Sequence, residues 1–401
     1  MRLIWLSEGP ETRTGFGNVT RYVCNGLSHV GFEVHILAWE SYWRTVMWRR
    51  CYVHSARYPG LGSTVLPFYL ASIQPNFMIT FGDPWWFKAI VRQNINEQMR
   101  AISCKWIMYY PLDGALPNGL LPQDWTETMK IPDLAVACSD YGAEVSRRCG
   151  IDAKQIPHGV DTSLFKPPES KELAKEKMGY QRKFVVLSDS RNQPRKLLPR
   201  LLAAFAKFAK GKNDVVLHLH TDPDDPLAKL IGLDLRKFIR DLDIDGKVVF
   251  TKGYTYDKGI ALEKLAEIYK SADVHVLSSA GEGFGLPTLQ ASASGVVPFA
   301  PDFSANRELI KGHGELIRVE RFVEGTFGFL RALMDVDDCA RRLTTYYENP
   351  SLLREVGEQA RAFALEYDWS KIVEQWAKFL AETDAKNQLM PDKAMPEIVG
   401  R

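Results

Sequence analysis

The clearest chemical signal in the sequence is a glycine-rich stretch, residues 279–290 (SAGEGFGLPTLQ), between a predicted strand and a predicted helix. Its glycines let the backbone approach a ligand, and Pro287 suits a first helical turn, where backbone amides lack partners. Those amides and the helix dipole favour an anion such as a diphosphate. Glu282 lies in the loop and Gln290 in the helix, so we expect them to contact different parts of one extended ligand. Tight turns need glycine in any case, so a purely structural interpretation stays open.

A second stretch places two cations beside the same site. Residues 188–196 (SDSRNQPRK) follow another predicted strand and carry Arg191 and Lys196. Arginine binds phosphate through a bidentate fork and lysine as a point charge. Either residue alone is typical of a solvated surface, but the two cations and the glycine-rich loop together favour a diphosphate site.

Two aspartates follow predicted strands in the first half of the chain. Asp113, in YYPLDG, either accepts a hydrogen bond from a substrate or caps a turn before Gly114. Asp83, in FGDPWW, is another carboxylate that follows a strand, and an Asp-Pro turn is the favoured of its two interpretations. Residues 222–225 (DPDD) are interpreted as a turn and a solvated acidic loop, so we predict no metal site.

The elements that position these residues alternate between strands and helices, which predicts an α/β protein with parallel sheets. In the first half, residues 3–6 predict a strand that leads into a glycine loop and a helix at 19–30. Further strands are predicted at 34–38, 77–81, 106–109 and 134–137. In the second half, a charged helix at 169–178 comes first. Strands are then predicted at 184–187, 215–219, 248–250, 274–277 and 296–300, and helices at 197–209, 227–242, 262–269, 288–293, 336–347, 351–367 and 370–382.

Length and composition fit this organisation. The chain has 401 residues and a net charge of +2, which favours two domains and disfavours a broad nucleic-acid surface. The six cysteines form no C-x-x-C pair and are predicted to be buried free thiols. No apolar run reaches the ~18 residues of a membrane span, and the start of the chain turns polar too soon for a signal peptide. We therefore expect a cytoplasmic protein.

With these residues identified, the sequence resembles the retaining glycosyltransferases of family 4, which have the GT-B fold. The family's E-x7-E motif is matched at Glu282, with Gln290 in the place of the second glutamate. The Arg and Lys of its G-R-x4-K motif fall on Arg191 and Lys196. Three more stretches are similar to family motifs: GFGN at 15–18, HGVD with FKP at 158–167, and DWS at 368–370.

The resemblance implies two Rossmann-like, doubly wound domains that face each other across a cleft, with a C-terminal helix that crosses back to the first domain. The boundaries expected are 1–165 for the acceptor-side domain, 166–366 for the nucleotide-sugar domain, 367–385 for the returning helix and 386–401 for a tail. It implies a nucleoside-diphosphate sugar as donor, with no metal and no cofactor.

The same resemblance assigns roles to individual residues. Arg191 and Lys196 hold the diphosphate, Glu282 and the amides of Phe284 and Gly285 contact the sugar, and Gln290 reaches the ribose. Gly15, Gly17 and Leu286 complete the donor-binding set, and residues 251–256 lie near the base. Asp113 stands where many relatives have a histidine and is included among the catalytic residues. An amide accepts only through its oxygen, so Gln290 is expected to alter ribose binding.

The implied reaction is transfer of a hexose to a hydroxyl group with retention at the anomeric carbon. The cations stabilise charge on the departing phosphate, which itself takes the acceptor's proton. Two alternatives stay open: a catalytically silent GT-B-like module that binds a nucleotide or a partner, which Gln290 and Asp113 favour, and an epimerase of the same fold.

The acceptor is not identified by the sequence: a saccharide, a lipid headgroup, a protein and a modified nucleic acid all remain open. Residues 42–50 (YWRTVMWRR) mix aromatic side chains with Arg44, Arg49 and Arg50. This stretch predicts either a peripheral contact with a lipid surface, an anionic polymer or nucleic acid, or a partly buried helix edge with solvated arginines.

Overall fold

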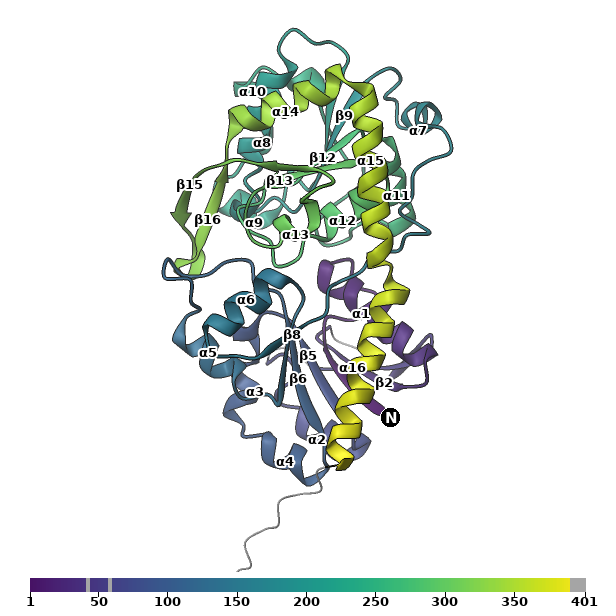
Figure 1. Cartoon of the computed structure of the whole chain (residues 1–401), viewed down its shortest axis with the longest axis vertical. Helices are drawn as coiled ribbons and strands as arrows, with labels where there is room; N and C mark the ends of the chain where they lie inside the picture. The colour runs from purple at the N-terminus through teal and green to yellow at the C-terminus, as the bar shows by residue number, and fades with distance from the viewer. Residues whose placement is uncertain (41–43, 57–59, 390–401) are drawn as a thin grey trace, which may run out of the picture.

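The computed structural model describes residues 1–40, 44–56 and 60–389, and it contains two α/β halves stacked end to end (Figure 1). The first half is built on an eight-stranded sheet in the order β3-β4-β2-β1-β5-β6-β7-β8. All its pairings are parallel except that between β3 and β4. The strands are β1 (Arg2–Ser7), β2 (Glu33–Ala38), β3 (Val46–Trp48), β4 (Cys51–Ser55), β5 (Phe77–Phe81), β6 (Lys105–Tyr110), β7 (Leu134–Ala137) and β8 (Ala153–Gln155).

Helices cover both faces of this sheet because successive side chains of a strand point to opposite faces. In β1, Leu3 and Trp5 belong to one hydrophobic cluster, and Ile4 and Leu6 belong to another. This burial on both sides explains the continuous apolar run that predicted the strand. The helices are α1 (Gly15–His29), α2 (Leu66–Ile73), α3 (Lys88–Arg92), α4 (Asn96–Ala101), α5 (Gln123–Met129) and α6 (Asp140–Arg148).

The second half repeats the design with a six-stranded parallel sheet in the order β11-β10-β9-β12-β13-β14. Its strands are β9 (Phe184–Asp189), β10 (Val215–His220), β11 (Val248–Phe250), β12 (Val274–Val276), β13 (Val297–Pro301) and β14 (Glu315–Ile317). Its helices are α7 (Lys171–Lys177), α8 (Leu198–Ala209), α9 (Pro226–Leu230), α10 (Leu235–Asp241), α11 (Leu262–Ser271), α12 (Leu286–Ala293) and α13 (Asn306–Ile310). The predicted α/β class with parallel sheets is confirmed.

The helix predicted at 370–382 is longer in the structure, where it extends from Trp369 to Leu389, and two other predicted elements also differ. The single helix expected at 227–242 is wrong, because α9 and α10 are separated by Gly232, whose φ of +73° breaks the helix. The helix expected at 19–30 begins earlier, at Gly15, because the Thr14 hydroxyl accepts a hydrogen bond from the amide of Gly17 and caps it.

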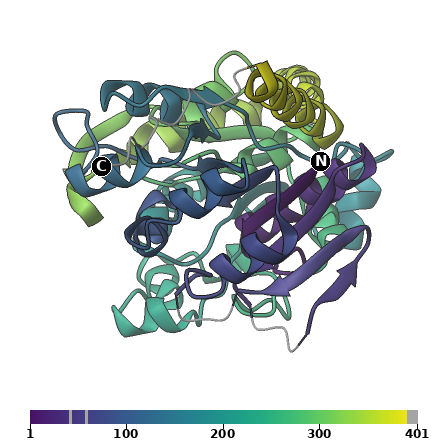
Figure 2. The same cartoon turned by 90° about the horizontal axis from the view of Figure 1, so that it is seen from below.

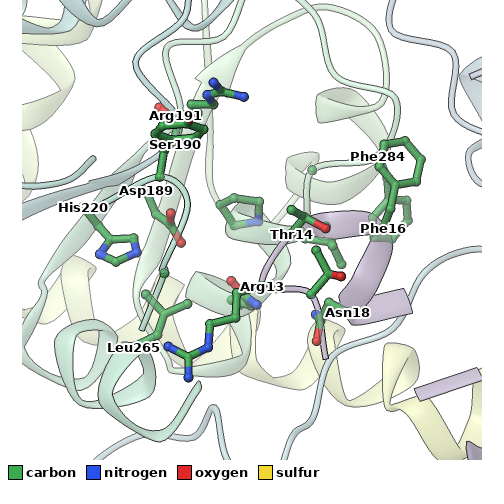
Figure 3. Close-up of a pocket in the computed structure, with 18 of the residues that line it drawn as sticks. Arg13, Thr14, Phe16, Asn18, Asp189, Ser190, Arg191, His220, Leu265 and Phe284 are labelled. Atoms are coloured by element: carbon green, nitrogen blue, oxygen red, sulfur yellow. The ribbon is translucent and has the colours of Figure 1, made fainter. Parts of the chain in front are cut away.

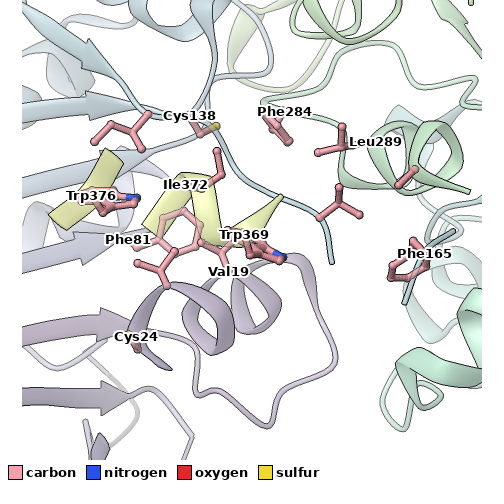
Figure 4. Close-up of a cluster of buried hydrophobic side chains, with 14 of the residues drawn as sticks. Val19, Cys24, Phe81, Cys138, Phe165, Phe284, Leu289, Trp369, Ile372 and Trp376 are labelled. Atoms are coloured by element: carbon pink, nitrogen blue, oxygen red, sulfur yellow. The ribbon is translucent and has the colours of Figure 1, made fainter. Parts of the chain in front are cut away.

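The C-terminal helices α14 (Val336–Glu348), α15 (Pro350–Ala364) and α16 (Trp369–Leu389) lead the chain back to the first half. Helix α16 lies along α1 and covers one face of the first sheet (Figures 1 and 2). The two helices touch at Gly26, where an added Cβ would lie 2.3 Å from a methyl carbon of Val373. Trp369 and Trp376 of α16 join a hydrophobic cluster that also contains Phe284 and Leu289 of the second half (Figure 4).

A hairpin absent from the sequence prediction joins the two halves at a second place. Strands β15 (Val319–Glu324) and β16 (Leu330–Met334) pair antiparallel and reach from the second half onto the first. The amide of Leu330 donates to the carbonyl of Ala115 at 2.8 Å. Phe329 is buried in the core of the first half, and its ring centroid lies 5.3 Å from that of Trp125.

The described part of the basic stretch, residues 44–50, is not a helix edge, so that interpretation is wrong for these residues. Tyr42 and Trp43 lie outside the described residues, Arg44 is exposed, and β3 is an edge strand of the sheet. Arg49, with φ of +53°, forms the turn into β4, and its guanidinium lies 5.1 Å from the ring centroid of Trp48. Whether this edge meets an anionic surface stays a prediction.

The structure also bears on the predicted free cysteines and on the search for a membrane-spanning segment. All six cysteines are free, and five of them are buried. Within the part of the chain that the structure describes, no helix is long and apolar enough to cross a membrane.

Candidate active site

A cleft of about 890 Å³ opens between the two halves, at the carboxyl ends of the strands of both sheets (Figure 3). Ligands of open α/β sheets bind at this edge. Thr14 and Phe16 at the start of α1 line one side, and Asp189 and His220 at the ends of β9 and β10 line the other. The residues predicted for the site that line this cleft are Gly15, Asp113, Arg191, Lys196, Glu282, Phe284, Gly285, Leu286 and Gln290.

Gly17 is the one predicted donor-binding residue that is not part of the cleft wall. It is buried, and a Cβ at this position would lie 2.3 Å from the backbone oxygen of Thr12. Glycine is therefore required at this position by the packing of the loop. Gly15 lines the cleft, and an added Cβ there would lie 3.7 Å from Leu286 Cδ1.

The glycine-rich loop has a reason for its glycines that the sequence did not reveal. Gly285, with φ of +110°, makes the turn into α12. At Gly281 an added Cβ would lie 2.2 Å from the backbone oxygen of Asp113, and at Gly283 it would lie 2.4 Å from Pro111 Cβ. Gly281 and Gly283 thus let the two halves approach each other closely, and Gly283 lines the cleft at this approach.

The substitution Gly281→Ala is expected to force the two halves apart at this contact. The new methyl group overlaps a backbone atom, which cannot move aside as a flexible side chain does. We expect the free energy of unfolding to fall by about 1–3 kcal/mol and sugar transfer to fall at least about tenfold, because the reacting groups lose their alignment. Small-angle scattering should report a larger radius of gyration. Gly246→Ala, where an added Cβ meets nothing within 4 Å, should leave all three measurements unchanged.

Charged side chains from both halves meet beside this loop. Lys196 forms an ion pair with Glu282, and Arg195 Nη1 lies 3.4 Å from the same Glu282 oxygen. Burial alone raises the pKa of a carboxyl, but here Lys196 and Arg195 outweigh it and hold the pKa of Glu282 at about 2. Glu282 is therefore ionised at neutral pH. Burial lowers the pKa of Lys196 and Glu282 opposes that effect.

Arg195 was missed by the sequence analysis, although it connects the whole cluster. Its Nε lies 3.2 Å from Asp113 Oδ2, and its Nη1 donates to the carbonyl of Gly281 and, at 3.3 Å, to the hydroxyl of Ser279. The only signal in the sequence was its place in the PRK triplet next to Lys196.

Asp113 has a role that neither sequence interpretation contained. Its carboxylate is bound by two arginines of the second half: Arg195, and Arg331 of β16, whose Nη1 lies 3.0 Å from Asp113 Oδ1. Arg331 also donates to the Asp113 backbone oxygen at 3.0 Å. Asp113 lines the cleft, but its charge holds the two halves together.

Arg191 and Lys196 line the same cleft but have different partners. Arg191 Nε donates to Asp225 Oδ2 at 2.6 Å, and its guanidinium lies 4.5 Å from the ring centroid of Tyr256. Tyr256 belongs to the loop 251–256 that was predicted near the base, and Tyr254 of this loop has its ring 4.3 Å from that of His220. This end of the cleft is therefore walled by aromatic rings and one cation.

A neutral histidine that the sequence analysis did not single out as a site residue also lines the cleft. Tyr109 donates its hydroxyl proton to the carbonyl of Ile156 at 3.0 Å, so its oxygen accepts from His158 Nδ1 at 2.7 Å. This arrangement leaves His158 Nε2 without a proton, as an acceptor. Burial lowers the pKa of His158 to about 3. The ring of Phe284 lies 4.8 Å from it.

A metal would need a group of oxygen, nitrogen or sulfur ligands. Across the described residues, no three His, Cys, Asp or Glu side chains are grouped in a way that could hold one. The cations of the cluster are Lys196 and Arg195.

Comparison with known proteins relates this site to a family. Residues 169–363 match the family model described as glycosyl transferases group 1. A mannosyltransferase, the MMP alpha-(1->4)-mannosyltransferase of Mycolicibacterium hassiacum, is 29% identical over 252 residues, which cover 61% of this chain and 53% of that protein. The mannosylfructose-phosphate synthase of Agrobacterium fabrum is 31% identical over 166 residues, covering 40% of this chain and 34% of that protein. The chain thus spans about half or less of the length of these relatives.

Solved structures resemble the whole chain. The sucrose-phosphate synthase of Thermosynechococcus elongatus superposes with a TM-score of 0.77 at 18% identity, covering 96% of this chain and all of that one. The Anabaena protein Alr3699/HepE, solved with UDP and glucose, superposes with a TM-score of 0.70 at 17% identity, covering 95% of this chain and all of that one. At such identities the likeness shows a shared fold.

Proposed function

We propose that the protein is a glycosyltransferase, because residues 169–363 match the glycosyl transferases group 1 family model and the whole chain has the GT-B fold. It moves a sugar from a nucleoside-diphosphate donor to a hydroxyl group of an acceptor. The observation that carries this proposal is the cluster of Lys196, Arg195 and Glu282 beside the amino end of α12, inside the cleft.

The cluster suits the charge that develops during transfer. As the bond from the anomeric carbon to the β-phosphate oxygen breaks, negative charge builds on that phosphate. Lys196 and the free amides at the start of α12 stabilise this charge more in the transition state than in the ground state. Glu282, ionised in the cleft, accepts hydrogen bonds from sugar hydroxyls. In the proposed reaction no divalent cation is required, because the side chains of Lys196 and Arg195 supply the positive charge.

We propose transfer with retention, in which the departing phosphate and the acceptor oxygen lie on the same face of the sugar ring. The acceptor oxygen forms its bond to the anomeric carbon as the phosphate departs, and the acceptor's proton moves to a phosphate oxygen. Gln290 reaches the ribose, and Tyr254 and Tyr256 flank the base. The unpaired cysteines support a reducing compartment such as the cytoplasm as the place of the reaction.

Nucleotide binding is the direct test of this proposal. UDP, GDP and ADP are each added to the purified protein with EDTA, and the melting temperature is recorded. Binding at ~100 times Kd stabilises the folded state by about 2.7 kcal/mol, so one nucleotide should raise the melting temperature by several degrees. UDP-glucose is the first donor to test, because the Anabaena neighbour was solved with UDP and glucose. GDP-mannose is the second, because one relative is named a mannosyltransferase.

The result separates the enzyme from its alternative. Transfer that persists in EDTA and yields a product of unchanged anomeric configuration supports the proposal. A protein that binds a nucleotide tightly but neither hydrolyses the matching donor nor transfers its sugar is instead the silent module. If no nucleotide stabilises the protein, both the enzyme and a nucleotide-binding silent module are rejected, and a silent module that binds a partner is the alternative that is left.

A further inference from the structure

Asp83 lies where the first half meets the cleft, and its backbone is explained by a turn. It follows β5 and precedes a 3₁₀ turn, Pro84–Phe87, in which the amide of Trp86 donates to the Asp83 carbonyl at 2.9 Å. The Asp-Pro turn predicted from the sequence is therefore present. The side chain does not cap this turn, so the turn explains the residue's backbone but not its carboxylate.

Two carboxylates of the first half line the cleft, and they differ in their partners. Asp113 is bound by Arg195 and Arg331. Within the described residues, the Asp83 carboxylate has neither a hydrogen bond nor an ion pair. Burial, together with the negative charge of Asp113, raises the pKa of Asp83 to about 7, although the positive charge of Arg195 acts in the opposite direction. A partly buried carboxylate without donors costs free energy that a ligand with hydroxyl groups would offset.

Aromatic rings line the same cleft as this carboxylate. Phe81 and Phe16 line the cleft, and their ring centroids lie 5.0 Å apart. The ring of Trp86 packs 5.2 Å from that of Phe16. Gly82 lets this layer close up, because an added Cβ would lie 2.6 Å from Trp86 Cε3. An apolar face next to a double hydrogen-bond acceptor matches a ring that carries hydroxyl groups on its edge and C–H groups on its face.

We propose that Asp83 binds the acceptor, and that the acceptor is a polyhydroxylated ring, either a saccharide or a cyclitol. This inference rests on the proposed glycosyl transfer and adds its substrate class. The Asp83 carboxylate accepts hydrogen bonds from hydroxyl groups of the acceptor ring and holds the attacking oxygen toward the donor sugar. Phe16 covers the apolar face of the ring. Asp83 takes up no proton in this step, because that proton goes to the departing phosphate.

The test compares donor consumption with and without a ring acceptor in the wild type and in Asp83→Asn. The donor is UDP-glucose or GDP-mannose, whichever matches the nucleotide that stabilises the protein. The acceptor probes are methyl α-glucopyranoside, methyl α-mannopyranoside and myo-inositol. We expect at least one probe to accelerate donor consumption in the wild type. Asp83→Asn should lower kcat/KM for that probe by about 10- to 100-fold, chiefly through KM, since one charged acceptor is lost.

Donor binding and pH dependence show whether Asp83 acts on the acceptor. In Asp83→Asn, the affinity for the nucleotide and the rate of slow donor hydrolysis by water should stay within about twofold of the wild-type values. The reason is that Asp83 is proposed to contact the acceptor and not the donor. In the wild type, kcat/KM for the acceptor should rise with pH through about 7, as Asp83 ionises under the influence of Asp113 and Arg195. The variant should lose this rise. His158, with a pKa of about 3, does not titrate in that range.

Asp152→Asn is the matched control, because Asp152 is an exposed aspartate of the same half at the amino end of β8, the edge of the sheet opposite the cleft. It should behave as the wild type. If Asp83→Asn folds poorly, Asp83→Glu keeps the charge and should recover part of the acceptor kcat/KM.

An unchanged acceptor kcat/KM in Asp83→Asn, or no acceleration by any ring probe, overturns this inference alone. A wild type that binds no nucleotide overturns the proposed function and this inference together.

Discussion

Replacing Lys196 with alanine is expected to lower kcat for sugar transfer by about 10²- to 10³-fold, the effect of removing one preorganised charge from a transition state. Lys196 is bound to Glu282 beside the free amides of α12, so its ammonium is fixed before a donor arrives. Little reorganisation is then needed as charge builds on the departing phosphate. The measurement is steady-state transfer at saturating donor, which separates kcat from donor affinity.

The same substitution also acts on stability, and the two effects are separable. Glu282 loses a close cation in a buried site, which we expect to lower the free energy of unfolding by about 3 kcal/mol. Rates are therefore compared at a temperature where circular dichroism shows both proteins folded. Lys207→Ala, which removes an exposed lysine from α8, is the control and should change neither quantity. If kcat of folded Lys196→Ala equals that of the wild type, Lys196 does not stabilise the departing phosphate.

The framework of this fold was predictable because its strands are buried on both faces. The stretches LIWL in β1 and FVVL in β9 are continuously apolar, so the positions of these strands follow from local composition alone. The hairpin of β15 and β16 gave no such signal, since five of the six residues of β15 are exposed. Its stability comes from Phe329 and Arg331, which bind to the first half, and sequence spacing carries no information about such a distant contact.

The site was only partly predictable for a related reason. The spacing of Arg191 and Lys196 placed both beside the cleft, as the structure has them. It did not determine where each side chain points. A 3₁₀ turn at Pro194–Lys196 ends at Leu197 with φ of +48°, and this local geometry turns Arg195 toward Glu282. Arg191 instead pairs with Asp225, a residue that the sequence suggested was solvated but that is buried.

The substitution Arg195→Met is expected to lower kcat by about 100-fold or more, because it removes the charge that links Asp113 with Glu282. Two carboxylates at the cleft lose a shared cation, and the carbonyl of Gly281 loses a hydrogen-bond donor. We expect the free energy of unfolding to fall by about 2 kcal/mol, which is less than the ~3–5 kcal/mol of a broken buried pair, because the Arg195 side chain is 30% exposed. Chemical denaturation and steady-state transfer measure the two effects.

Comparison with Arg331→Met shows which link matters for the reaction. Arg331 holds Asp113 from the same half as Arg195 does, but among the described residues its only ion pair is with Asp113. Its loss weakens the contact between the halves without disturbing Glu282, so kcat should fall less than about tenfold, as expected for a group outside the reacting centre. Equal losses of kcat in the two variants would mean that Arg195 acts only by joining the halves. A larger loss in Arg195→Met places its main effect on Glu282, because Asp113 is common to both.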